Sequence, residues 1–308
     1  MIEIPDQRYN SRPSHSSGFL ELPLCRLHVA RAGSGPPLVM LPATVSLLEN
    51  WYELIDFAAQ WFEVIFFELP GHGQSACFQQ PFSTALMGPL VEQIADHLGW
   101  QRFSLMGFSF GGVLTMEALM YLQSRVEQVM LLAPCLTGRA IQLSVARRAA
   151  VLRLAGVFQR PGARAVLYRL LHDLPYRPYS AALLRSIGSV EDTIPMEQVL
   201  EKILPATLEI LSVQITAALQ YECQPEAPFE IPCYFAMSVI DPLIDYATTR
   251  ATLARFFAQP AITELHYPFH QPPRPFTFDE MNAGYRQSVE EFLQHHFPRS
   301  MAPLPDSP

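Results

Sequence analysis

The segment LMGFSFGG, residues 105–112, places one serine between two phenylalanines, with a glycine two positions away on each side. An apolar segment precedes it, and the helix-like segment GGVLTMEALMYLQSR follows from residue 111. In this strand–turn–helix context, G-x-S-x-G lifts the serine above the edge of a sheet, so Ser109 is the candidate nucleophile. Gly107 and Gly111 fit such a turn, because side chains there would clash across it. The alternative is an ordinary Gly-Ser turn.

A nucleophilic serine needs a base, and the base needs an acid that orients it. The expected chain order for this turn is serine, then acid, then histidine. Asp241 follows the apolar segment CYFAMSVI and precedes a proline, which predicts a carboxylate at the end of a strand; Asp245 is its rival in the same loop. His270 is preferred as the base, because it lies beyond the predicted strand ITELHY, whereas His266 lies within it.

Negative charge on an attacked carbonyl oxygen needs backbone N–H donors around it. Phe110 begins the predicted helix, where N–H groups have no intrahelical acceptor. A second donor is expected from the loop after PPLVML, with Thr44 as the candidate and Ala43 as the alternative. Phe108 and Ala43 are the candidate substrate-binding residues of an apolar acyl pocket. The alternative is that Phe108 and Phe110 only pack in the core.

The elements that must position these residues alternate along the chain. Short, continuous apolar segments alternate with amphipathic stretches, which predicts an α/β fold with a mostly parallel sheet of about eight strands and helices on both faces. The alternation stops over residues 138–228, which predict a helical cap inserted after the sixth strand. Residues 18–137 and 229–298 then form the core, and residues 1–17 and 299–308 are expected to be flexible.

The composition and net charge argue against several classes of partner and site. The 308 residues carry a net charge of −8, which argues against nucleic acid as a partner. No apolar run is long enough to cross a membrane. Five widely spaced cysteines without a CxxC motif argue against a disulfide framework and against a metal site, and favour a cytoplasmic location.

Positive charge is concentrated in the predicted cap. Nine arginines and a single acidic residue lie between positions 139 and 185. Three interpretations stay open: a solvated helical face, recognition of an anionic substrate such as an acyl group on a phosphorylated carrier, or contact with an acidic membrane surface or partner protein.

Together these motifs resemble the α/β-hydrolase fold superfamily over residues 18–298. The segment ELPGHGQS, residues 68–75, is similar to the family's D-x-P-G-H-G-x-S, with Glu68 in place of the aspartate. In the family, the histidine of this motif, His72 here, is structural. VIDPL at 239–243 and the late His270 also fit. One departure concerns the oxyanion loop, where Pro42-Ala43 stands in place of the family's usual His-Gly.

The resemblance implies a serine hydrolase for a small-molecule ester, thioester or lactone, without metal or organic cofactor. Dehalogenases and epoxide hydrolases of this fold carry aspartate at the position of Ser109 and are disfavoured. C–C bond hydrolysis, acyl transfer and cofactor-free haloperoxidase chemistry on the same residues stay open. So does a non-catalytic binding protein, which the change at Pro42-Ala43 favours weakly.

Overall fold

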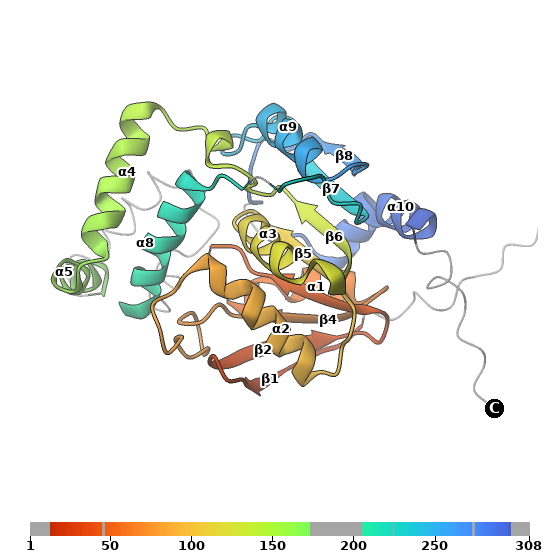
Figure 1. Ribbon diagram of the computed structural model, residues 1–308, viewed down its shortest axis with the longest axis horizontal. Coiled ribbons are helices and arrows are strands. Elements are labelled where there is room, and N and C mark those ends of the chain that lie inside the picture. The colour runs from red at the N-terminus through yellow and green to blue at the C-terminus, as the bar shows by residue number, and fades with distance from the viewer. Residues whose placement is uncertain (1–12, 45–46, 173–204, 224, 273–274, 297–308) are drawn as a thin grey trace, which may run out of the picture.

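The computed structural model describes residues 13–44, 47–172, 205–223, 225–272 and 275–296. Its centre is an eight-stranded sheet in the order β1-β2-β4-β3-β5-β6-β7-β8 (Figure 1). β2 pairs antiparallel with both β1 and β4, and every other neighbouring pair is parallel. The predicted α/β class and mostly parallel sheet are therefore confirmed. The strands are β1 (His15–Glu21), β2 (Arg26–Ala32), β3 (Pro37–Leu41), β4 (Glu63–Phe67), β5 (Phe103–Phe108), β6 (Val126–Leu132), β7 (Cys233–Ser238) and β8 (Ala261–Leu265).

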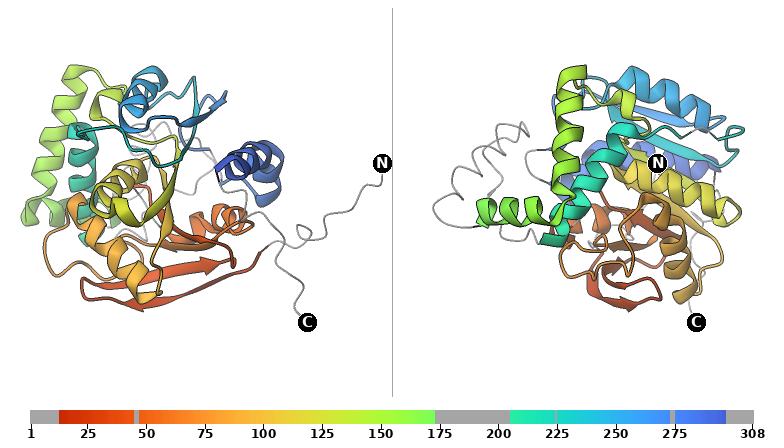
Figure 2. Two further views of the ribbon diagram at one scale, coloured as in Figure 1. Left: turned by 45° about the vertical axis from the view of Figure 1, so that its right-hand side comes forward. Right: turned by 60° about the vertical axis from the view of Figure 1, so that its left-hand side comes forward.

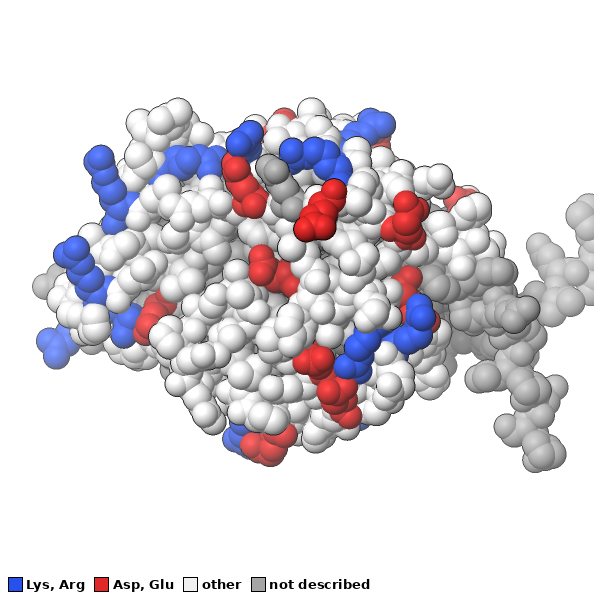
Figure 3. All heavy atoms as spheres, in the orientation of Figure 1, with Lys and Arg blue, Asp and Glu red and all other residues white. Residues whose placement is uncertain are grey.

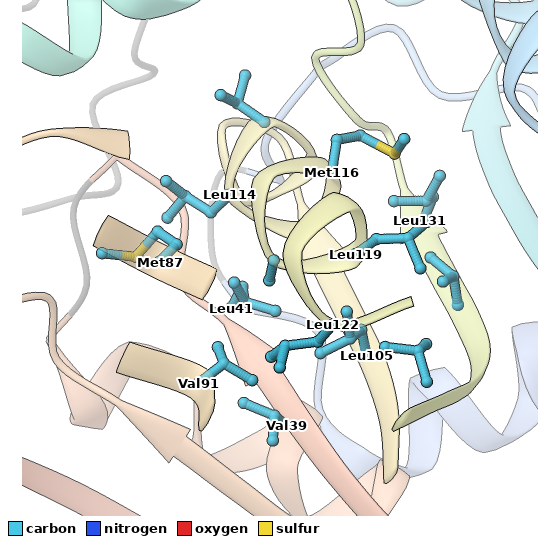
Figure 4. Close-up of a cluster of buried hydrophobic side chains, with 14 of the residues drawn as sticks. Val39, Leu41, Met87, Val91, Leu105, Leu114, Met116, Leu119, Leu122 and Leu131 are labelled. Carbon is cyan, nitrogen blue, oxygen red and sulfur yellow. The ribbon is translucent and has the colours of Figure 1, made fainter. Parts of the chain in front are cut away.

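Both faces of the sheet are covered, which is why its central strands are apolar throughout. Val39 and Leu41 of β3 belong to one buried cluster, shown in Figure 4, whereas Leu38 and Met40 belong to a second cluster on the opposite face. Successive side chains of a strand point to opposite faces. The left view of Figure 2 shows helices on the two sides of the sheet. They are α2 (Met87–His97), α3 (Gly111–Leu122) and α9 (Tyr246–Phe256) on the first face, and α1 (Tyr52–Ala58) and α10 (Phe278–His296) on the second.

Three described helices lie between β6 and β7, inside the predicted cap range 138–228: α4 (Val145–Phe158), α5 (Pro161–His172) and α8 (Pro205–Gln220). They gather at one side of the sheet (Figures 1 and 2). Arg148 of α4 joins the two ends of this insertion, because its guanidinium donates to the carbonyl oxygens of Leu219, Gly138 and Ile141 at 2.8, 2.7 and 3.0 Å. Residues 173–204 lie outside the described part of the chain, so the extent of the cap stays a prediction.

One predicted boundary was placed too late. The core was expected to begin at residue 18, but β1 begins at His15. This edge strand has few buried side chains, so the polar residues at its start carry no apolar alternation to reveal it. The segments predicted to be flexible, 1–17 and 299–308, lie largely or wholly outside the described residues.

The turn after β4 buries a histidine completely. His72 has no exposed surface, and its backbone N–H donates to the Leu69 carbonyl oxygen at 2.8 Å. Burial lowers the pKa of His72 to about 4, against an opposing effect of the Leu69 carbonyl oxygen. The imidazole is therefore neutral at pH 7.

This depressed pKa predicts an acid-sensitive fold. Between the ordinary value of 6.5 and about 4 the unfolded chain binds a proton at His72 that the folded chain does not, so stability is full above pH 6.5 and falls by about 3 kcal/mol toward pH 4. His72→Asn should flatten this part of the profile of unfolding free energy against pH, measured by urea denaturation. The control is His97→Asn, which removes an exposed imidazole from α2. Parallel profiles for wild type and His72→Asn would contradict this prediction.

Candidate active site

Ser109 occupies the turn between β5 and α3 with a φ of 54°. A side chain in this left-handed region is strained by about 1–3 kcal/mol and persists only where neighbours over-determine it. Three backbone hydrogen bonds do so here. Ser109 N–H donates to the Leu132 carbonyl at 3.1 Å, and its own carbonyl accepts from the N–H groups of Gly112 and Cys135, both at 2.9 Å.

The two glycines of the motif allow the strand, the turn and the helix to approach closely. A Cβ at Gly107 would collide with Thr115 Oγ1 and with the Gly111 carbonyl oxygen. A Cβ at Gly111 would lie 2.6 Å from the Leu41 carbonyl oxygen at the end of β3. Because Gly111 has no side chain, the loop after β3 can lie beside the start of α3.

The structure brings the three predicted residues into one hydrogen-bonded chain. His270 Nε2 lies 2.8 Å from Ser109 Oγ, and His270 Nδ1 lies 2.7 Å from Asp241 Oδ2. The histidine side chain is 9% exposed and the aspartate side chain 1%, whereas the serine is half-buried. The serine hydroxyl is thus the outermost group of a chain whose far end is shielded from water.

The carboxylate of Asp241 is held from both sides. Burial alone would raise the pKa of Asp241, but the hydrogen bond and charge of His270, together with the N–H groups of Ile244 and Leu243, lower it below its ordinary value. Those two N–H groups donate to Oδ1 at 2.9 and 2.8 Å, which leaves Oδ2 for the imidazole. An ionised carboxylate in this position fixes which ring nitrogen carries the proton.

The two rival residues lie elsewhere. Asp245 is the N-cap of α9, where its Oδ1 accepts from the Thr248 N–H at 2.8 Å. His266 was expected within the last strand, but β8 ends at Leu265 and the His266 side chain is exposed. Neither takes part in the chain that joins Ser109 to Asp241.

Ser238, at the end of β7, contributes a contact that sequence reasoning missed. Its hydroxyl donates to the Tyr267 carbonyl at 2.7 Å and accepts from the Tyr267 N–H at 2.9 Å. It therefore joins the strand that precedes Asp241 to the loop that carries His270. A lone serine at a strand end carries no signal that would have revealed this role.

One candidate oxyanion donor, Phe110, directly follows the serine, and the loop that carries the other approaches the start of α3. Phe110 precedes the first residue of α3, so its N–H belongs to the helix start, and its side chain packs in the core. Thr44 and Ala43 belong to the loop after β3, and the Pro42 carbonyl oxygen lies 3.1 Å from the Cβ position of Gly111. Residues 45–46 lie outside the described chain, and the donor role of Thr44 stays a prediction.

Phe108 lies beside the candidate base. Its ring stacks on the His270 ring at 5.7 Å between centroids and meets Trp51 edge-on at the same separation. The ring therefore contacts the imidazole, a neighbour that the sequence could not indicate. Its predicted part in an acyl pocket, like that of Ala43, stays a prediction.

Glu68 has a structural role that the sequence marked only as a departure from the family motif. Its buried carboxylate accepts from the N–H groups of Leu48 and Gln74, at 3.2 and 2.6 Å, and bonds to His28 Nδ1 at 3.0 Å. Gly73, with a φ of 50°, leaves room for this carboxylate. Glu68 thereby links the loop after β3 to the turn after β4.

Arginines gather on the outer helices of the insertion, as Figure 3 shows over α4 and α5. Arg164 pairs with Glu209 and Arg139 pairs with Glu222, both at 2.7 Å. Four further arginines of this region are exposed, at positions 147, 153, 160 and 169. Their predicted contact with an anionic substrate or membrane surface stays a prediction.

The described residues offer neither a membrane span nor a metal site. No helix in this part of the chain is long and apolar enough to cross a membrane. The same residues contain no group of three histidine, cysteine, aspartate or glutamate side chains placed to hold a metal ion.

Comparison with known proteins adds to this geometry. The model of the alpha/beta hydrolase fold family matches residues 36–174. A pimeloyl-[acyl-carrier protein] methyl ester esterase of Nitrosomonas europaea is 31% identical over 119 residues, which are 38% of this chain and 45% of that protein. A soluble epoxide hydrolase of a Corynebacterium species is 33% identical over 87 residues, 28% of this chain and 30% of that protein. The chain thus spans less than half the length of these curated relatives.

Solved structures show the same fold. A hydrolase from Pseudomonas aeruginosa superposes with a TM-score of 0.64, covering 91% of this chain and 98% of that one at 17% identity. At this identity the likeness concerns the fold alone.

The close packing at Gly107 predicts a sharp effect of one added methyl group. Gly107→Ala should lower the free energy of unfolding by about 1–3 kcal/mol, because strand, turn and helix must move apart to admit it. Gly18→Ala is the matched control, since Gly18 also lies in a strand and its Cβ would meet nothing within 4 Å. Urea denaturation of both variants measures the difference, and equal stabilities would count against the tight turn.

Proposed function

We propose that this protein is a serine hydrolase that cleaves a carboxylic ester, thioester or lactone. The match of residues 36–174 to the alpha/beta hydrolase fold family and the similarity to an esterase support this proposal. The observation that carries this proposal is the continuous chain Ser109 Oγ–His270–Asp241, with links of 2.8 and 2.7 Å. These distances lie within hydrogen-bond reach for a nucleophile and its base.

In the first half of the reaction, Ser109 Oγ attacks the carbonyl carbon of the substrate and its proton passes to His270 Nε2. Asp241 accepts a hydrogen bond from the Nδ1–H group of His270, which keeps Nε2 free to act as the base and stabilises the imidazolium that forms. The tetrahedral intermediate carries negative charge on the former carbonyl oxygen. The N–H groups of Phe110 and Thr44 are the proposed donors to that oxygen.

Collapse of the intermediate expels the alcohol, thiol or lactone hydroxyl, which takes the proton from His270 Nε2 and leaves an acyl group on Ser109. Water then attacks the acyl-enzyme, with His270 again as the base. Addition of water releases the acid and restores the serine hydroxyl.

A serine at this position favours acyl chemistry over epoxide opening. An epoxide hydrolase of this fold attacks with a carboxylate, which forms an ester that water can cleave. A serine that opened an epoxide would form an ether, and the same base could not hydrolyse it. The likeness to an epoxide hydrolase therefore supports the fold, and Ser109 supports the ester-type substrate.

The nucleophile itself is the first test. Wild-type protein should react with a fluorophosphonate probe and hydrolyse short- and medium-chain p-nitrophenyl esters. Ser109→Ala should lose probe labelling and at least about 10⁴-fold in kcat. A folded wild type that neither labels nor turns over these esters would overturn the proposal in favour of a non-catalytic binding protein.

The two aspartates provide a matched pair. Asp241→Asn should reduce kcat for p-nitrophenyl esters by about 10⁴-fold, because the amide stabilises the wrong tautomer of His270. Asp245→Asn should change kcat by less than about twofold, since asparagine is an equally good N-cap for α9. Similar losses in the two variants would show that the reaction does not depend on the hydrogen bond to His270.

A further inference from the structure

Helix α8 crosses the edge of the sheet at which Ser109 lies. Near its start, Thr207 Oγ1 donates to the Gly71 carbonyl at 2.9 Å, and Ile210 fills the space beside Gly71 that a side chain would need. Near its end, the carbonyl of Ala218 accepts from Cys135 Sγ at 3.9 Å. Gly71 lies in the turn after β4 and Cys135 in the loop after β6, so α8 contacts the segments that follow the carboxyl ends of both strands.

The sheet order shows what lies beneath the middle of this helix. β3 and β5 lie between β4 and β6, and all four strands are parallel. Three strand spacings amount to about 14 Å, and the helix rises about 12 Å between residues 210 and 218. The centre of this span therefore lies over the ends of β3 and β5, which lead to Thr44 and Ser109.

Gln214 stands at that centre, four residues from both Ile210 and Ala218 and seven from Thr207. This spacing places it on the face of α8 that meets the core. Its side chain is fully buried, and neither Nε2 nor Oε1 has a hydrogen-bond partner among the residues that the structure describes.

A buried amide without partners is unfavourable, by about 1–3 kcal/mol for each unsatisfied group. A leucine or methionine would fill the same space of an apolar helix face without this penalty. A polar side chain over the nucleophile is explained if its amide forms hydrogen bonds with the bound substrate.

We propose that Gln214 is a substrate-binding residue that selects acyl substrates carrying an uncharged hydroxyl or carbonyl group apart from the scissile bond. This inference rests on the proposed serine hydrolase function. The amide offers donors and an acceptor, so it can pair with a hydroxyl in either direction or donate to a carbonyl oxygen. Being neutral, it cannot compensate a buried charge, which disfavours a carboxylate or ammonium group at that point of the substrate.

The test compares p-nitrophenyl octanoate with a set of its monohydroxy analogues, the hydroxyl placed at successive carbons of the acyl chain. Wild type should prefer at least one analogue over a neighbouring isomer. Gln214→Met keeps the volume and removes the amide, and it should lower kcat/KM for that analogue roughly 10- to 100-fold relative to kcat/KM for octanoate. Gln220→Met, at an exposed position of the same helix, is the matched control and should keep the preference.

A binding measurement separates this inference from the proposed function. In the Ser109→Ala background, calorimetry gives the Kd of the preferred analogue, or of every analogue if wild type turns over none, with and without Gln214→Met. Selective weakening for a hydroxylated ester supports the role of Gln214 even if no ester is hydrolysed. Equal weakening for all esters, no preference among the isomers, or a lowered Tm with the preference intact would overturn it.

Discussion

The left-handed backbone of Ser109 is the constraint on which the rest of the site depends. A φ of 54° at a residue with a side chain is unfavourable by itself, and it persists because β6, the loop after it and α3 all form hydrogen bonds with the Ser109 backbone. Gly107 and Gly111 make the required approach sterically feasible. The sheet beneath is buried on both faces, so the turn rests on the packed core of the molecule.

The other functional loops are tied together at the same edge of the sheet by buried polar contacts. Ser238 joins the ends of β7 and β8, which carry Asp241 and His270. Glu68 joins the loop after β3 to the turn after β4. Loops are ordinarily the mobile parts of a fold, and these hydrogen bonds provide the preorganisation that acid–base chemistry requires.

The helices of the insertion between β6 and β7 differ in what they contact. Its inner helix, α8, packs against the turn at Gly71 and against Cys135, whereas α4 and α5 present arginines to solvent. Arg148 binds backbone carbonyls near both ends of the insertion, and Thr207 of α8 joins the insertion to the core through its hydrogen bond to Gly71. Such an arrangement allows the inner face of the insertion to set substrate preference without altering the nucleophile.

The sequence by itself determined what depends on neighbouring residues: the turn around Ser109, the alternation that specifies a parallel sheet, and the order of candidate nucleophile, acid and base. It left Asp241 against Asp245 and His270 against His266 as preferences, because each pair shares one short loop or strand end. Only the tertiary structure placed Asp241 beside His270 and Asp245 at a helix cap. The contacts of Glu68 and Ser238 and the burial of Gln214 were equally out of reach, since both depend on residues distant in the chain.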